Sequence, residues 1–193
     1  LEFPGIYWSF EGEKSEQAET IASLQYLYII ALIIIYALLA IPFNSYIQPI
    51  IVMAAIPFGL IGAVWGHVVM GMDVTILSGF GVVALTGVVV NDSLVMVDYV
   101  NRKRGIGLSE MESARQAGLS RFRPILLTSL TTFAGLTPLL LEKSLQAKFL
   151  VPMGISLGFG VIFATVITLI LVPAMYLILE DIRTFLFGPE DKL

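Results

Sequence analysis

The sequence has no cysteine, one histidine and few charged residues, which make up 13% of the 193 positions, whereas hydrophobic residues make up 57%. Without cysteine, neither a disulfide framework nor a thiolate metal site can form. A soluble domain has about a quarter of its residues charged, so this chain needs lipid as the solvent for most of its surface. The net charge of -4 offers no basic face for a nucleic acid.

Long stretches without charge divide the chain into membrane spans. A helix needs about 20 apolar residues to cross a hydrocarbon core of about 30 Å. The uncharged stretch between Glu19 and Asp73 is too long for one helix, and Pro42 and Pro49 lie near its middle. We therefore expect an all-α integral membrane protein, a bundle of five transmembrane helices within residues 20–180, with spans at about 21–41, 49–71, 74–100, 124–141 and 149–179.

Basic residues predict the orientation of these spans. Eight of the eleven lysines and arginines lie in the loop 101–123 or in the tail 181–193. Because positive charge marks the cytoplasmic side, the loop and the C-terminus are expected inside and the N-terminus outside. Within the loop, Ser109 is a suitable N-cap and Glu112 follows three residues later, which predicts a short surface helix over 108–117.

The first 19 residues predict the end of an extracytoplasmic domain. Five glutamates accompany Tyr7 and Trp8 there, without the basic start and apolar centre of a signal peptide. This acidic segment leads directly into the first span, so we expect the chain to be a fragment of a larger protein.

Small residues recur within the expected spans at spacings that let helices approach closely. In polytopic proteins such positions serve packing far more often than ligand binding. They are Ala55, Gly59, Gly62 and Gly66 in the second span, Gly79 and Gly87 in the third, and Gly154 and Gly158 in the fifth.

The third span carries the most informative polar residues, because Asn91, Asp92 and Ser93 stand together in an apolar stretch. Asp92 lies about eight residues, roughly 12 Å, from the expected cytoplasmic end of the span. An aspartate at such depth costs about 2.5–3.5 kcal/mol, so it normally faces a bundle interior or a water-filled path. Asp92 is therefore either a proton carrier or a structural residue held by interhelical hydrogen bonds.

Other polar side chains have more ordinary interpretations. Asp98 is four residues from Arg102, a spacing that predicts a surface ion pair. Thr128, Thr131 and Thr132 of the fourth span are candidate partners for Asp92, unless each bonds a carbonyl of its own helix. Arg121 precedes Thr128 by two helical turns. The single histidine, His67, is expected to be packed or interfacial and not a proton carrier.

No pattern indicates an enzyme. The sequence contains no nucleophile and base pair, no metal-ligand cluster and no phosphate-binding loop, so neither a cofactor nor a metal is expected. Met70 and Met72 are too few to argue a metal path.

Three segments together carry a family resemblance: GVVVNDSLVMVDYVNR from Gly87, ARQAGLSRFRPILLTSLTTFAGLTPLL from Ala114, and GISLGFGVIFATVITLILVPAMYLI from Gly154. The chain resembles the last five transmembrane helices of the resistance-nodulation-division (RND) efflux permeases, hydrophobe/amphiphile branch. The resemblance implies half of a twelve-helix membrane domain in the bacterial inner membrane. It also implies a proton antiporter for multidrug export that assembles as a homotrimer with a periplasmic adaptor and an outer-membrane channel.

The same resemblance implies a proton relay. In the family, aspartates of the N-terminal half pair with a lysine on the tenth helix, and an arginine and a threonine follow on the eleventh; here these last two positions are Arg121 and Thr128. The lysine position is occupied by Asn91, so this chain departs from the pattern. We expect Asp92 to supply an additional carboxyl, with Ser93, Asp98, Thr131 and Thr132 as secondary candidates.

Two alternatives to multidrug export stay open. One is a permease of the same architecture for lipids, metal ions or proteins, and the other is a structural membrane module without a relay. Dependence of export on Asp92 distinguishes the relay from the structural module.

Overall fold

The computed structural model describes residues 12–187 of the chain, which form seven helices and no strand within that range. The helices are α1 Glu13–Phe43, α2 Gln48–Met53, α3 Ile56–Met70, α4 Ile76–Gly105, α5 Glu110–Leu140, α6 Leu145–Lys148 and α7 Val151–Phe187. The all-α architecture expected from the sequence is confirmed. Residues 1–11 of the expected periplasmic segment and 188–193 of the expected tail lie outside the described residues.

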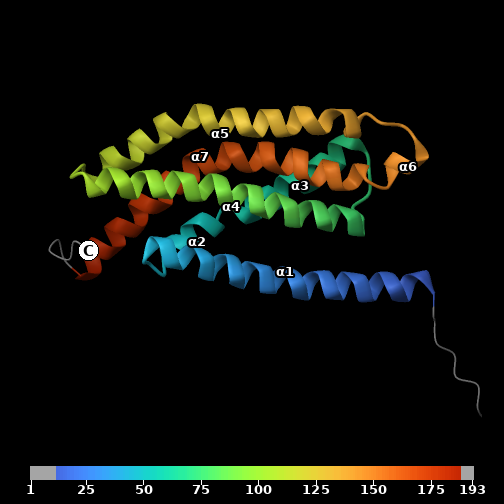
Figure 1. Cartoon of the computed structure of the whole chain (residues 1–193), viewed down its shortest axis with the longest axis horizontal. Coiled ribbons are helices and arrows are strands. Elements are labelled where there is room, and N and C mark those ends of the chain that lie inside the picture. Colours follow the sequence, from blue (N-terminus) through green and yellow to red (C-terminus); the bar gives the residue numbers. More distant parts are fainter. Residues whose placement is uncertain (1–11, 188–193) are drawn as a thin grey trace, which may run out of the picture.

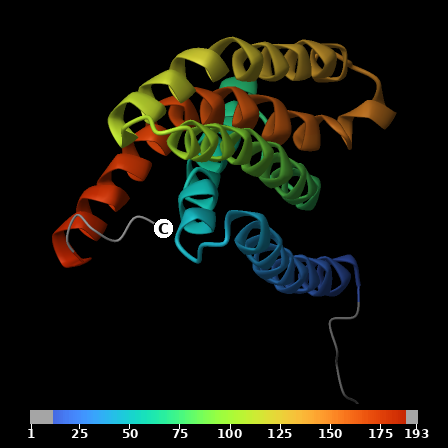
Figure 2. The ribbon, with the colours of Figure 1, turned by 60° about the vertical axis from the view of Figure 1, so that its left-hand side comes forward.

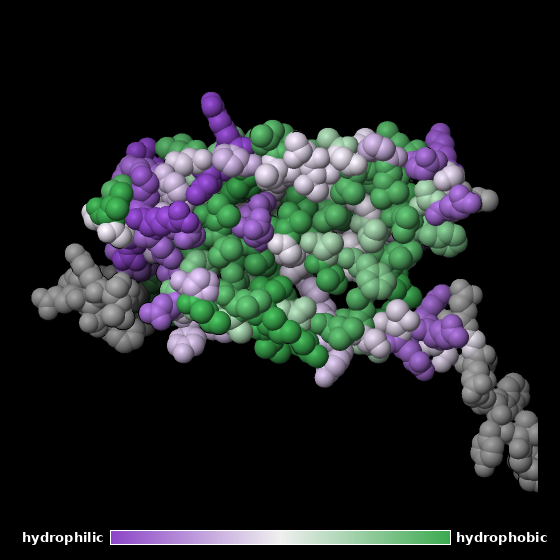
Figure 3. All heavy atoms as spheres, viewed as in Figure 1, coloured by the Kyte–Doolittle hydropathy of each residue, from purple (hydrophilic) through white to green (hydrophobic). Residues whose placement is uncertain are grey.

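Successive long helices run in opposite directions, as Figure 1 shows. The α1–α2 turn, the α4–α5 turn and the end of α7 lie at one end of the bundle, and the α3–α4 turn and α6 lie at the other. Hydrophobic residues cover the middle of the molecular face in Figure 3, while hydrophilic residues gather mostly at its two ends. This arrangement suits a multi-pass membrane protein; which end faces the cytoplasm stays a prediction.

Four stretches are long and apolar enough to cross a membrane: Ser15–Phe43, Gln48–Met70, Ile76–Gly105 and Val151–Ile182. The fourth expected span, 124–141, lies within α5 and is less apolar because it contains Thr128, Thr131, Thr132 and Thr137. Each of these hydroxyls donates a hydrogen bond to a carbonyl of its own helix three or four residues back, which lowers the cost of placing it in lipid. A membrane position for α5 remains a prediction.

The second expected span is interrupted. Residues 49–71 form two helices, α2 and α3, separated at Ala54 and Ala55. Pro57 stands in the first turn of α3, where its missing N–H costs no helical hydrogen bond, but a continuous helix would lack one at this position. α3 then ends at Gly71, whose φ of +63° is the left-handed conformation that glycine adopts most easily.

The short surface helix expected at 108–117 is not a separate element. Ser109 does cap a helix by accepting a hydrogen bond from the Glu112 N–H, but that helix continues to Leu140 as α5. The basic residues that suggested a loop lie along a continuous helix. Charges can line a helix without ending it, because the backbone alone makes the helical hydrogen bonds.

α7 is the centre of the bundle and packs most extensively against α4, α3 and α5 (Figures 1 and 2). The largest fully buried side chains include Leu85 and Met96 of α4 and Ile155, Val161 and Val172 of α7. Burial of such side chains contributes about 1.5–3 kcal/mol each when the reference solvent is water, although in lipid close packing must supply the stabilisation instead.

Glycines allow α7 to approach its neighbours closely. A Cβ added at Gly62 would lie 2.4 Å from the Phe163 Cβ, and one at Gly66 would lie 2.5 Å from the Phe159 Cβ. Gly59, Gly79, Gly154 and Gly158 also face neighbouring side chains, as expected. Nothing lies within 4 Å of a Cβ built at Gly87, so no close contact is made there among the described residues. Gly81 and Gly160, which the sequence reasoning missed, are close contacts.

Most of α1 lies apart from the other long helices in both ribbon views, while its C-terminal end lies beside α2 and contributes Leu39 to the core (Figures 1 and 2). Its window of highest hydropathy is only 6% buried. A hydrogen bond of 2.8 Å between the Tyr28 and Thr86 hydroxyls joins it to α4.

Candidate functional site

Three consecutive residues at the middle of α4, Asn91, Asp92 and Ser93, lie in different environments. Asn91 is exposed, whereas Asp92 is only 9% exposed and Ser93 is fully buried. Consecutive helical residues are 100° apart, so the side of α4 that packs into the core contains Asp92 but not Asn91. Val89 and Met96, which share that side with Asp92, belong to the main hydrophobic core.

Asp92 is buried without a partner. Within residues 12–187 its carboxyl group makes no hydrogen bond and no ion pair, and the adjacent Ser93 hydroxyl is a buried polar group without a hydrogen bond. Burying a charged carboxylate in apolar surroundings is costly unless a proton, a cation or hydrogen-bond donors neutralise it. A proton is the simplest way to neutralise this carboxyl group.

The threonines of α5 do not supply the missing partner. The Thr128 hydroxyl donates to the Ile125 carbonyl, and the Thr131 and Thr132 hydroxyls both donate to the Thr128 carbonyl. Thr128 and Thr131 are exposed. These contacts correspond to the structural interpretation of the threonines, and no hydrogen bond connects them to Asp92; a role in proton transfer stays a prediction.

Arg121 lies at the packed side of α5 against Tyr99 of α4. Its guanidinium carbon is 5.0 Å from the centre of the Tyr99 ring, and its Nε is a buried donor without an acceptor. The Tyr99 hydroxyl is 3.0 Å from the Ser120 Oγ. The structure thus brings Arg121 to α4, but two turns from Asp92 along that helix.

The surface pair and the histidine agree with expectation. Asp98 and Arg102 form the predicted ion pair, with 2.5 Å between Oδ2 and Nη2. His67 is buried, its Nδ1–H donates to the Ala63 carbonyl at 2.9 Å, and its Nε2 accepts from the Ser78 hydroxyl at 2.8 Å. Since Ser78 also completes the capping box of α4, whose N-cap is Thr75, His67 holds the α3–α4 turn in place.

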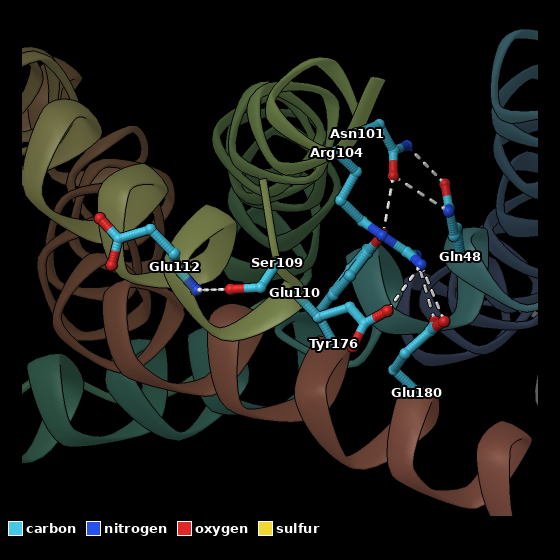
Figure 4. A network of polar contacts seen from close by, with 8 residues as sticks. All are labelled: Gln48, Asn101, Arg104, Ser109, Glu110, Glu112, Tyr176 and Glu180. Atoms are coloured by element: carbon cyan, nitrogen blue, oxygen red, sulfur yellow. Dashed lines mark hydrogen bonds and ion pairs between the residues drawn. The ribbon is translucent and has the colours of Figure 1, made fainter. Parts of the chain in front are cut away.

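A network that the sequence reasoning missed surrounds Arg104 at the expected cytoplasmic end (Figure 4). The Arg104 guanidinium donates to both carboxylate oxygens of Glu180, at 2.9 and 3.2 Å, and also to Glu110 at 3.0 Å and to the Tyr176 hydroxyl at 3.0 Å. These residues come from α4, α5 and α7. Arg104 therefore ties the α4–α5 turn to the central helix.

The network extends to α2 through two side-chain amides (Figure 4). The Tyr176 hydroxyl donates to the Asn101 Oδ1 at 3.0 Å, and Asn101 and Gln48 exchange two hydrogen bonds of 2.8 and 3.2 Å. An open cavity of about 1200 Å³ lies beside these side chains, between the α1–α2 turn, the α4–α5 turn and α7. The sequence feature that could have pointed to this network is Glu180, which directly follows the last apolar stretch.

Glu112 and Arg115 form a separate ion pair on the surface of α5. Hydrogen bonds from Arg115, and then from Gln116, lower the pKa of Glu112 to about 2. Its side chain is 37% exposed and that of Arg115 is 62% exposed, whereas Glu180 and Arg104 are 13% and 23% exposed.

These exposures predict different costs of removing each pair. We expect Arg104→Gln to destabilise the folded protein by about 2–3 kcal/mol, because it removes the largely buried guanidinium that joins Glu180, Glu110 and Tyr176. Arg115→Gln, the matched control, should cost at most about 0.5 kcal/mol, since exposed pairs contribute little. Thermal unfolding of the detergent-solubilised intact protein measures both; equal losses of stability would show that the network is no stronger than a surface pair.

Comparison with known proteins places these features in context. The family model described as the AcrB/AcrD/AcrF family matches residues 2–180. Two X-ray structures of a heavy metal efflux pump, in crystal forms II and I, are similar to the chain with TM-scores of 0.79 and 0.77, each at 26% sequence identity. Both matches cover 92% of this chain but only 18% of the pump, so the chain spans less than a fifth of its length.

Proposed function

Because the chain belongs to the AcrB/AcrD/AcrF family, we propose that it is the proton-coupling membrane half of an export permease. The complete protein would be a secondary active transporter of the bacterial inner membrane, driven by the proton motive force. The resemblance to RND permeases is confirmed by the family match and by the similarity to an efflux pump. The proposal concerns what this half contributes.

The observation that carries the proposal is the buried carboxyl of Asp92 in the middle of α4. It is 9% exposed and has neither an ion-pair nor a hydrogen-bond partner in the described part of the chain. Ionisable groups that face the interior of a membrane bundle typically mark proton or ion pathways. Asn91 stands where the family pattern has a lysine, so no lysine at that position pairs with the Asp92 carboxyl. The carboxyl can therefore take up one proton and release it during each transport cycle.

In this scheme one group of residues carries the proton, and a second group contacts the N-terminal half of the permease. Asp92, with Ser93 beside it, is the proton-carrying group inside this half. Asn91 on the exposed side of α4 and Thr128 on the exposed side of α5 are placed to meet the N-terminal half, with Arg121 two turns from Thr128. Asp98, Thr131 and Thr132 have the surface and own-helix contacts described above and are secondary to this scheme.

The proposed assembly follows the family. The N-terminal half of the permease covers the exposed sides of α4 and α5, three protomers associate, and a periplasmic adaptor and an outer-membrane channel complete the export path. No metal or cofactor has a part in the scheme.

The substrate is the point on which two candidates differ. The resemblance to the hydrophobe/amphiphile branch favours a multidrug or amphiphile exporter. The similar structures are described as a heavy metal efflux pump, which favours a metal ion. We propose an amphiphile as the substrate, because the sequence motifs that suggested the branch run through most of the chain.

A transport assay separates the candidates. Cells that express the intact permease are loaded with ethidium, a cationic amphiphile, or with Zn²⁺ or Cu⁺, and efflux is followed with and without a protonophore. We expect protonophore-sensitive ethidium efflux and unchanged metal content. Metal efflux without ethidium efflux would assign the metal instead, and efflux that persists with the protonophore would contradict proton coupling.

A further inference from the structure

Two cations share one aromatic ring between α4 and α5. The Arg121 guanidinium carbon lies 5.0 Å from the centre of the Tyr99 ring, and the Lys103 Nζ lies 5.5 Å from the same centre. Both distances are within the approximately 6 Å over which a cation is attracted to an aromatic face. Tyr99 is thus a contact point for charge from both helices.

No carboxylate orients these cations. Within residues 12–187, the ion pairs of arginine and lysine involve Arg102, Arg104 and Arg115, and neither Lys103 nor Arg121 has an acidic side chain within 4 Å. The Arg121 Nε is buried and lacks an acceptor. The ring of Tyr99 is therefore the contact that sets the direction of the Arg121 side chain.

The ring itself is held in place. The Tyr99 hydroxyl and the Ser120 Oγ are 3.0 Å apart, and Ser120 directly precedes Arg121. Ser120 contacts the hydroxyl at the edge of the ring, and Arg121, the next residue of α5, contacts the face of the ring. This two-point attachment fixes the α4–α5 contact at the level of Arg121.

We propose that Tyr99 is a positioning residue for Arg121, acting through its ring and not through proton transfer by its hydroxyl. This inference rests on the proposed function, in which Arg121 belongs to the relay. A guanidinium held by a neutral ring keeps its full charge available to a group of the N-terminal half. A carboxylate in place of the ring would neutralise that charge.

Substitutions at Tyr99 separate the ring from the hydroxyl. Tyr99→Phe keeps the ring, so proton-driven export by the intact permease should stay within about twofold of the wild type, as one hydrogen bond between membrane helices contributes little. Tyr99→Leu removes the ring, and export should fall about tenfold as Arg121 loses its orientation. Tyr99→Met provides a second non-aromatic side chain if the leucine variant assembles poorly.

A double-mutant cycle tests that the ring acts through Arg121. Arg121→Ala should reduce export at least as much as Tyr99→Leu, and adding Tyr99→Leu to Arg121→Ala should change export by less than about twofold, because the two residues act as one unit. Rescue by Tyr99→Phe together with this non-additivity is not expected of a ring that only fills space.

The outcomes distinguish this inference from the function beneath it. If Arg121→Ala abolishes export while Tyr99→Leu and Tyr99→Met export normally, or if the two losses multiply, the positioning role is overturned and the relay stands. If Arg121→Ala exports normally, Arg121 is no part of the relay and both statements about it fail.

Discussion

Replacing Asp92 by asparagine in the intact permease is expected to reduce export at least about a hundredfold, the usual contribution of a positioned proton-transfer group. Asparagine has nearly the same shape as aspartate, so packing against Val89 and Met96 should survive. What the variant loses is the ability to bind and release a proton. Efflux of a fluorescent amphiphile from energised cells measures the effect.

Asp98→Asn is the matched control for this prediction. Asp98 is on the same helix, but its partner is Arg102 at the surface and its side chain is 38% exposed. Because exposed pairs contribute little, export should stay within about twofold of the wild type. Normal export by the Asp92 variant, with normal expression and trimer assembly, would reduce Asp92 to a structural residue.

Gly81→Ala should destabilise the protein more than an alanine at any other glycine of α4. A Cβ at Gly81 would lie 2.4 Å from the Met153 carbonyl oxygen and 2.8 Å from the Ser156 Cβ, both on α7. The backbone at Met153 cannot turn away as a flexible side chain could, so the two helices must separate. Overpacking of this kind costs about 1–3 kcal/mol.

Gly118→Ala on α5 is the control, since nothing lies within 4 Å of a Cβ built there. It should leave stability unchanged or raise it by up to about 1 kcal/mol, because alanine favours helix more than glycine does. Thermal unfolding of the detergent-solubilised permease compares the two variants. A Gly81 variant that unfolds at the same temperature as the Gly118 variant would contradict the close α4–α7 contact.

Much of the fold could be predicted because membrane helices leave a strong signal in one sequence. Charge-free stretches predicted the approximate positions of the long helices, and the spacing of Asp98 and Arg102 predicted a contact within one helix. Such interactions depend only on residues three or four positions apart. The Ser109 cap was predictable for the same reason.

Boundaries were less predictable where charge and helix geometry disagree. The basic residues Arg115 and Arg121 suggested a loop, yet they lie on α5, whose backbone hydrogen bonds form whether or not the side chains are charged. Conversely, the apolar stretch 49–71 gave no sign of its break except Pro57, and proline also occurs within α5 and α7 without ending them.

The candidate site depended on contacts between distant residues. Arg104 and Glu180 are 76 positions apart. Glu180 directly follows the last apolar stretch, but nothing in a single sequence pairs it with Arg104. Likewise, the side of α4 that meets α7 determines that Asp92 is buried, that Asn91 is exposed and that Gly81, not Gly87, is a close contact within this chain. Tertiary packing sets that rotation.

The measurement that tests the central claim most directly is proton flux in proteoliposomes that contain the purified intact permease. An imposed pH gradient is applied with and without amphiphile, and internal pH is followed with a trapped dye. We expect substrate-dependent proton flux in the wild-type protein and in Asp98→Asn, and none above background in Asp92→Asn. Equal substrate-dependent flux with Asp92→Asn would contradict the assignment of Asp92 as the proton-carrying group of this half.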